Sequence, residues 1–292
     1  MLRKGDLTQG GITGTLLHFT LPMLVGSFLQ QCYNIADTLI VGQCIGAGAL
    51  AAVGSAYTLM VFLISVLLGL AMGSGTVFSL HYGAGNHVAL RRSIFSSFVL
   101  IGIVTLILNV AVFIWLDPIL RLLQVPQDIY GMMRSYLWII FCGIVFTFIY
   151  NFYASLLRAV GDSVTPLWFL AVSVVLNIAL DLFFILQLDW GIQGAAAATV
   201  LAQGVAALGI IIYTYRRRPE LRWHHEDMCF DRTCLKEIAS FSTLTCIQQS
   251  VMNLGILMVQ GLVNSFGTAV MAAFAAAVKI DSFAYMPVQE FG

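Results

Sequence analysis

Uninterrupted apolar runs, each long enough to cross a bilayer, constrain this chain more than any other feature. A spanning helix needs about 20 mostly apolar residues, and 60% of the 292 residues are hydrophobic while only 10% are charged. An ordinary soluble chain carries about 25% charged residues. The runs also lack the alternation that marks membrane β-strands. The sequence therefore predicts an all-α, polytopic membrane protein.

Clusters of charged residues divide the apolar runs into eight predicted helices. The first run is too long for the hydrophobic region of a signal peptide, and no small-residue cleavage site follows it, so we expect it to be retained. The predicted helices cover approximately Leu16–Ile45, Ala49–Leu80, Ser93–Leu116, Ser135–Leu157, Thr165–Leu188, Gly191–Tyr215, Ile238–Val263, and Ala269 to the end.

The basic residues predict how these helices are oriented. If the helices alternate in direction, eleven Lys and Arg residues fall on one side of the membrane, and only Arg121 and Arg134 fall on the other. Cytoplasmic loops carry the excess of Lys and Arg. We therefore expect a multi-pass protein of the cell membrane with a cytoplasmic amino terminus.

An internal repeat predicts two lobes. Gln30-Gln31 in the first predicted helix is echoed by Gln248-Gln249 in the seventh, and both helices start on the same side. Some transporters are built from parallel repeats related about the membrane normal. We expect residues 1–215 to form an amino-terminal six-helix lobe, 216–235 a cytoplasmic inter-lobe loop, and 236–292 the first two helices of a second lobe. Because this second copy stops within its second helix, the sequence predicts a carboxy-terminal truncation.

Two acidic residues inside the predicted helices, Asp37 and Asp181, are the strongest functional signal. An ionisable residue at that depth costs roughly 2.5–3.5 kcal/mol on insertion scales and usually marks an ion pathway or coupling site. Asn177 precedes Asp181 by four residues, which places both side chains on one helix face. Burial disfavours the ionised carboxyl group. The pair is thus predicted to bind a proton, or Na⁺ together with oxygens of Asn177 and Thr199.

Other interpretations of the intramembrane charges remain open at this stage. The two aspartates could instead bond only to neighbouring polar side chains and fix helix packing. Lys279 and Asp281, two residues apart in the last predicted helix, do not face each other directly. They could form structural pairs with other partners or contact a substrate.

Composition and motifs exclude several classes of protein. The 14 basic and 14 acidic residues cancel, so neither nucleic acid nor an acidic partner is expected. No Ser-His or Cys-His arrangement indicates an enzyme, and no cofactor is expected besides a coupling ion. The loop residues His224, His225, Cys229 and Cys234 fit zinc spacing poorly, so no metal site is expected either.

Several short motifs lie along the whole chain, and their order and spacing are specific although no single one is decisive. The motifs are Leu21-Pro22, Asn34 to Asp37, Tyr82 to Gly85, Arg158 to Asp162, Asn177 to Asp181, and Lys279 to Asp281. Together they resemble the MATE family, the multidrug and toxic compound extrusion transporters.

This resemblance implies an antiporter of two six-helix lobes that exports cationic, amphipathic compounds in exchange for H⁺ or Na⁺. The coupling site of the family's amino-terminal lobe maps onto four residues here, with Tyr136 close by as a cavity residue; the four are Asp37, Asn177, Asp181 and Thr199. The seventh predicted helix has no acidic residue. This favours the DinF-like branch, which the resemblance associates with coupling through the first lobe. The implied partners are small organic cations, the coupling ion and the bilayer.

Two further functions stay open beside the antiporter. A flippase for lipid-linked oligosaccharides or peptidoglycan precursors resembles MATE proteins in fold and would need cationic residues in its cavity to hold a pyrophosphate. Lys279 is the one candidate for that role. The other possibility is a truncated fragment that does not transport, because most of the second lobe is missing.

Overall fold

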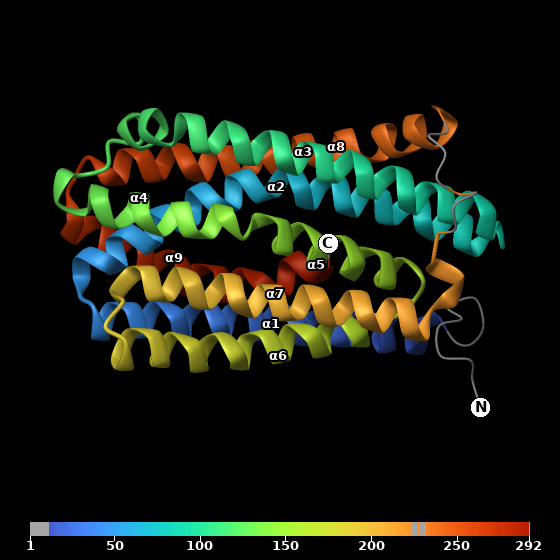
Figure 1. The fold of residues 1–292 in the computed structure, drawn as a ribbon, viewed down its shortest axis with the longest axis horizontal. Helices are drawn as coiled ribbons and strands as arrows, with labels where there is room; N and C mark the ends of the chain where they lie inside the picture. Colours follow the sequence, from blue (N-terminus) through green and yellow to red (C-terminus); the bar gives the residue numbers. More distant parts are fainter. Residues whose placement is uncertain (1–11, 224–226, 228–231, 292) are drawn as a thin grey trace.

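The computed structural model describes residues 12–223, 227 and 232–291, and in this part the chain is a long bundle of helices (Figure 1). The helices run roughly parallel to the long axis of the bundle. They are α1 (Ile12–Cys44), α2 (Ala47–Gly83), α3 (His87–Leu122), α4 (Gln127–Cys142), α5 (Ile144–Ala159), α6 (Val164–Leu182), a π-helical turn η1 (Phe183–Gln187), α7 (Gly191–Arg217), a 3-10 turn η2 (Pro219–Leu221), α8 (Arg232–Asn264) and α9 (Thr268–Phe291).

The prediction of an all-α membrane protein is confirmed by these helices. Five of them are long and apolar enough to cross a membrane, and the bent pair α4 and α5 makes a sixth span if it is counted as one. Each of the eight predicted helices corresponds to a described helix or bent pair. The division into two lobes and the orientation in the membrane stay predictions.

The fourth predicted helix differs from the structure in two ways. It begins at Gln127, directly after Pro126, instead of at Ser135. It is also not continuous, because α4 ends at Cys142 and α5 leaves it at an angle of 49°. Gly143 stands at this bend, where a Cβ atom would lie 2.5 Å from a methyl group of Val200 on α7. The close approach of α7 therefore requires glycine at the bend.

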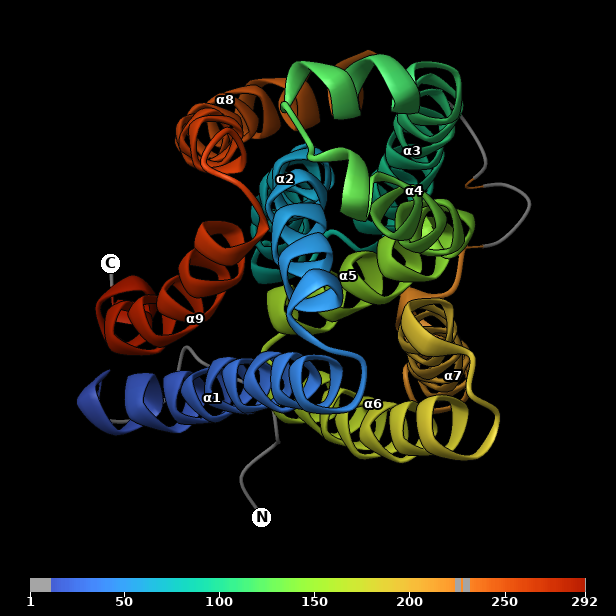
Figure 2. The same ribbon diagram turned by 90° about the vertical axis from the view of Figure 1, so that its left-hand side faces the viewer.

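Helix α2 occupies the centre of the bundle, and Figure 2 shows the other helices arranged around it. Its most extensive neighbour is the antiparallel helix α8. The whole contact between these two helices is called the α2–α8 seam below. In one half of the seam, Gly69 and Gly73 face Cys246 and Ser242. A Cβ atom on Gly69 would lie 2.6 Å from the Cα of Cys246. Small residues thus let the two backbones approach closely, as in many membrane helix pairs.

The other half of the seam is polar. Ser55 and Thr58 of α2 meet Gln260 and Asn264 of α8, and all four side chains are buried. Asn264 donates to Ser55 Oγ (3.1 Å) and to the Leu123 carbonyl (2.8 Å). Gln260 donates to Asn264 Oδ1 (2.8 Å) and accepts from Thr58 (3.2 Å). These four residues are called the seam cluster.

Helices α1, α6 and α7 form a layer along one side of the bundle, at the bottom of Figure 1. The turn between α6 and α7 is tight, since Asp189 and Gly191 both adopt positive φ angles of 51° and 54°. Trp190 in this turn stacks on Phe184 of the π-helical turn, with ring centroids 5.1 Å apart. This layer and its neighbour α4 position the candidate site.

Candidate cation and substrate site

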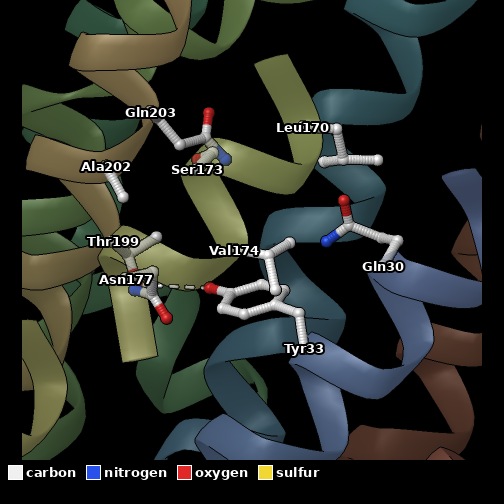
Figure 3. A pocket seen from close by; sticks show the side chains of 9 residues that line it. All are labelled: Gln30, Tyr33, Leu170, Ser173, Val174, Asn177, Thr199, Ala202 and Gln203. Carbon is white, nitrogen blue, oxygen red and sulfur yellow. Dashed lines mark hydrogen bonds between the residues drawn. The ribbon is translucent and has the colours of Figure 1, made fainter. Parts of the chain in front are cut away.

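A small cavity lies between α1, α6 and α7 and is partly open to the outside. Both polar and apolar side chains line it (Figure 3). It is called the first cavity, and its lining residues are Gln30, Tyr33, Leu170, Ser173, Val174, Asn177, Thr199, Ala202 and Gln203.

Thr199 joins the three helices around the first cavity. Its hydroxyl lies 3.4 Å from the Tyr33 hydroxyl of α1. It also accepts a hydrogen bond from Nδ2 of Asn177 on α6, at 3.3 Å. Figure 3 shows the Tyr33 ring reaching across from α1 toward these two side chains. The hydroxyl groups of Tyr33 and Thr199 and the amide of Asn177 therefore form one connected polar group in the lining of the cavity.

Asp181 and Asn177 contribute oxygens that the protein does not satisfy. Asp181 is fully buried, and Asn177 is 2% exposed. Within the described part of the chain, neither carboxyl oxygen of Asp181 nor Oδ1 of Asn177 has a hydrogen-bond partner. The π-helical turn starts two residues after Asp181, and such turns are frequent at functional sites. Three buried acceptors without a donor require a proton, a cation or water.

Asp37 lies on α1, one helical turn after Tyr33, and it is half-buried. It is close enough to Asp181 for the two carboxyl groups to interact electrostatically. It interacts in the same way with Tyr33 and with the buried Tyr136 of α4. The structure thus brings together the two acids and the polar residues that the sequence singled out.

Asp281, another predicted site residue, is not part of this group. It is exposed on α9 and does not line the first cavity. The side chain of Lys279 lies outside what the structure describes. The loop residues His224, His225 and Cys229 lie outside the described ranges too. The described residues contain no cluster of three His, Cys, Asp or Glu side chains that could hold a metal ion.

Sequence reasoning missed Gln30 and Gln203, which both line the first cavity. It did not single out Tyr33 either. Helical spacing carried a usable signal for all three, because Tyr33 precedes Asp37 by four residues and Gln203 follows Thr199 by four. Gln30 precedes Tyr33 by three. Amide and hydroxyl groups at that spacing from a predicted site residue share its helix face.

Comparison with known proteins gives matches along the whole chain. The MatE family matches residues 22–183, more than half of the chain. The probable multidrug resistance protein YpnP of Bacillus subtilis (strain 168) is 32% identical over 298 residues, which cover the whole chain and 65% of YpnP. The chain thus spans less than two thirds of this curated relative's length.

Two solved structures share the fold. One is an outward-facing conformation of a multidrug resistance MATE family transporter, with 23% identity, a TM-score of 0.88, and coverage of 99% of this chain and 64% of the other. The other is the Vibrio cholerae MATE transporter VcmN in its bent form, with 27% identity, a TM-score of 0.79, and coverage of 94% and 62%. The resemblance inferred from the short motifs is therefore confirmed, and the chain belongs to the MATE family.

Proposed function

We propose that this chain carries the ion-coupling half of a secondary active multidrug efflux antiporter. The protein would export cationic, amphipathic compounds across the cell membrane in exchange for H⁺ or Na⁺. The observation that carries this proposal is the set of three buried oxygens of Asn177 and Asp181 that have no hydrogen-bond partner among the described residues. A buried carboxylate without donors is too costly to persist as a bare anion. The site must therefore take up a proton or a metal cation whenever it is closed to water.

The neighbouring carboxyl group of Asp37 influences how readily Asp181 takes up a proton or a metal cation. Two carboxyl groups that interact electrostatically titrate as a pair, since ionising one opposes ionising the other. An organic cation near the pair would favour the ionised forms and so release the bound proton or Na⁺. Such mutual exclusion between substrate and ion is what antiport requires. Coupling through this helix layer also fits the DinF-like branch, because α8 has no acidic residue from Ile238 to Asn264.

The cavity lining favours an exported cation over an anionic lipid precursor. A flippase needs cationic side chains to hold a pyrophosphate. No Lys or Arg is among the described residues that line the first cavity. Its polar surface consists of hydroxyl and amide groups, with two carboxyl groups near Tyr33. This lining suits a positively charged ligand.

The test is ion release upon ligand binding, measured with the 292-residue chain in nanodiscs. Tetraphenylphosphonium is titrated by calorimetry in buffers of different ionisation enthalpy, which gives the number of protons released, and the titration is repeated with Na⁺ present. We expect release of H⁺, or displacement of Na⁺, that Asp37→Asn and Asp181→Asn each abolish. Asn177→Ala should weaken coupling less, because it removes an orienting group and not a titrating one.

A double variant decides the matter. If Asp37→Asn combined with Asp181→Asn releases as many protons and displaces as much Na⁺ as the parent chain, the coupling site lies elsewhere. Asp281 would then be the next residue to examine.

A further inference from the structure

Arg92, near the start of α3, is a cation whose charge the described part of the chain does not balance. It is partly buried, its Nε has no hydrogen-bond partner, and no ion pair among the described residues includes it. The adjacent Arg91 differs, because its Nε lies 2.7 Å from Oδ2 of Asp227. A guanidinium group can only donate hydrogen bonds. Arg92 therefore lacks an acceptor, and an anion would supply one.

Ser96, one helical turn after Arg92, has the same need. It is fully buried, and its hydroxyl has no partner among the described residues. Residues four apart on a helix share one face, so the two donors are neighbours. Phosphate oxygens accept charge-assisted hydrogen bonds from arginine and can reach a hydroxyl group directly or through a bridging water. The pair is thus a donor set that fits a phosphate group.

The same face of α3 continues as an apolar stripe. Spacings of three or four residues lead from Arg92 and Ser96 along one side of the helix, and the last four residues of this series are exposed. Figure 1 shows α3 along the outer edge of the bundle, beside α8. The series is called the α3 stripe, and it comprises Arg92, Ser96, Val99, Ile103, Ile107, Val110 and Ile114.

The length of α3 places the polar end of this stripe at the level of lipid headgroups. Its 36 residues span about 54 Å at 1.5 Å per residue, whereas the hydrocarbon core is about 30 Å thick. Roughly 12 Å at each end of the helix therefore lies outside the core. Arg92 comes about 7.5 Å after the first residue of α3, and Ile103 follows about 16 Å further along. The stripe thus has the order of a phospholipid, with the phosphate outside and the acyl chain inside.

We propose that Arg92 and Ser96 bind the phosphate of an anionic phospholipid whose acyl chain lies along the apolar part of the α3 stripe. The argument is one of charge complementarity, because Arg92 offers a positive charge that no described acid neutralises. The adjacent Ser93 contacts α8, with its hydroxyl 3.5 Å from Sγ of Cys234. The bound lipid therefore lies at the edge of the contact between α3 and α8. This inference does not depend on which compound the protein exports.

The test is lipid binding to the purified 292-residue chain, measured by native mass spectrometry. Dioleoyl phosphatidylglycerol should bind more tightly than dioleoyl phosphatidylcholine, whose choline neutralises the same phosphate. We expect Arg92→Gln to weaken phosphatidylglycerol binding about fivefold, the effect of one basic residue near an anionic lipid surface, and to leave phosphatidylcholine binding within twofold. Arg92→Lys should keep the preference for phosphatidylglycerol, because it keeps the charge. Glycerol 3-phosphate at the same concentration should not compete, since it has no acyl chain.

A matched control and a second variant separate this site from general effects. Arg217→Gln removes an exposed arginine at the same end of the bundle, on α7, and should leave both lipids unaffected. Ile103→Gln should weaken both lipids by a similar factor, because it changes the acyl contact and not the charge. The proposal is wrong if Arg92→Gln binds phosphatidylglycerol within twofold of the parent chain, or loses both lipids equally. Competition by glycerol 3-phosphate would overturn it too, since the site would then take free phosphate.

Discussion

The seam cluster and the candidate site are both buried groups of polar residues, and they differ in how many of their polar atoms have hydrogen-bond partners within the described residues. In the seam cluster, every side-chain amide and hydroxyl of Ser55, Thr58, Gln260 and Asn264 has a hydrogen-bond partner. At the candidate site, the carboxyl group of Asp181 and Oδ1 of Asn177 have none among the described residues.

The difference separates a structural role from a functional one. Buried polar groups normally find partners, and a fully satisfied network fixes the packing of the helices that contribute to it. A group left with unpaired acceptors is less stable on its own, so its retention indicates that something else completes it. By this criterion the seam cluster holds α2 to α8, and the Asp181 region is the one that we propose to bind a cation.

The largest expected effect on stability is at the seam cluster. Asn264→Leu removes the bonds to Ser55, to the Leu123 carbonyl and from Gln260. Interhelical hydrogen bonds in membrane proteins average roughly 0.6 kcal/mol each, and the groups left unpaired add to the loss. We expect destabilisation of about 2–3 kcal/mol, measured as a lower unfolding temperature in detergent. An unchanged unfolding temperature would contradict a structural role.

A somewhat smaller effect is expected in the glycine half of the seam. Gly69→Ala places a methyl group against the backbone of Cys246, 2.6 Å from its Cα, so α2 and α8 must separate. Overpacking of this kind costs about 1–3 kcal/mol. Gly131→Ala is the control, because nothing lies within 4 Å of the added methyl group, and alanine favours the helix. Equal unfolding temperatures for the two variants would mean that the seam is not close-packed.

The smallest effect on stability is expected from Asp181→Asn, although the same change should abolish ion release. Its carboxyl oxygens accept no hydrogen bond from the described protein, so none is lost. The amide also removes the repulsion with Asp37. We expect an unfolding temperature at pH 7 no lower than that of the parent chain. A large decrease would place Asp181 with the structural group and undo the comparison.

The sequence by itself determined the class of fold and the two most informative residues. Apolar length is a local property, so the positions of the spans follow from composition along the chain. The cost of burying a carboxyl group is likewise independent of which helix it faces, and this alone singled out Asp37 and Asp181. The motifs then gave the family.

Only the tertiary structure decided how the helices present their side chains to one another. The bend at Gly143 depends on the approach of Val200 from α7, which no local pattern encodes. The pairing of Ser55 with Asn264, the cavity between Tyr33 and Thr199, and the position of Gln203 in the cavity lining all depend on the rotation of each helix about its axis. That rotation is set by the packing of whole helix faces, because in a membrane the apolar side chains have no preference between lipid and neighbouring helix.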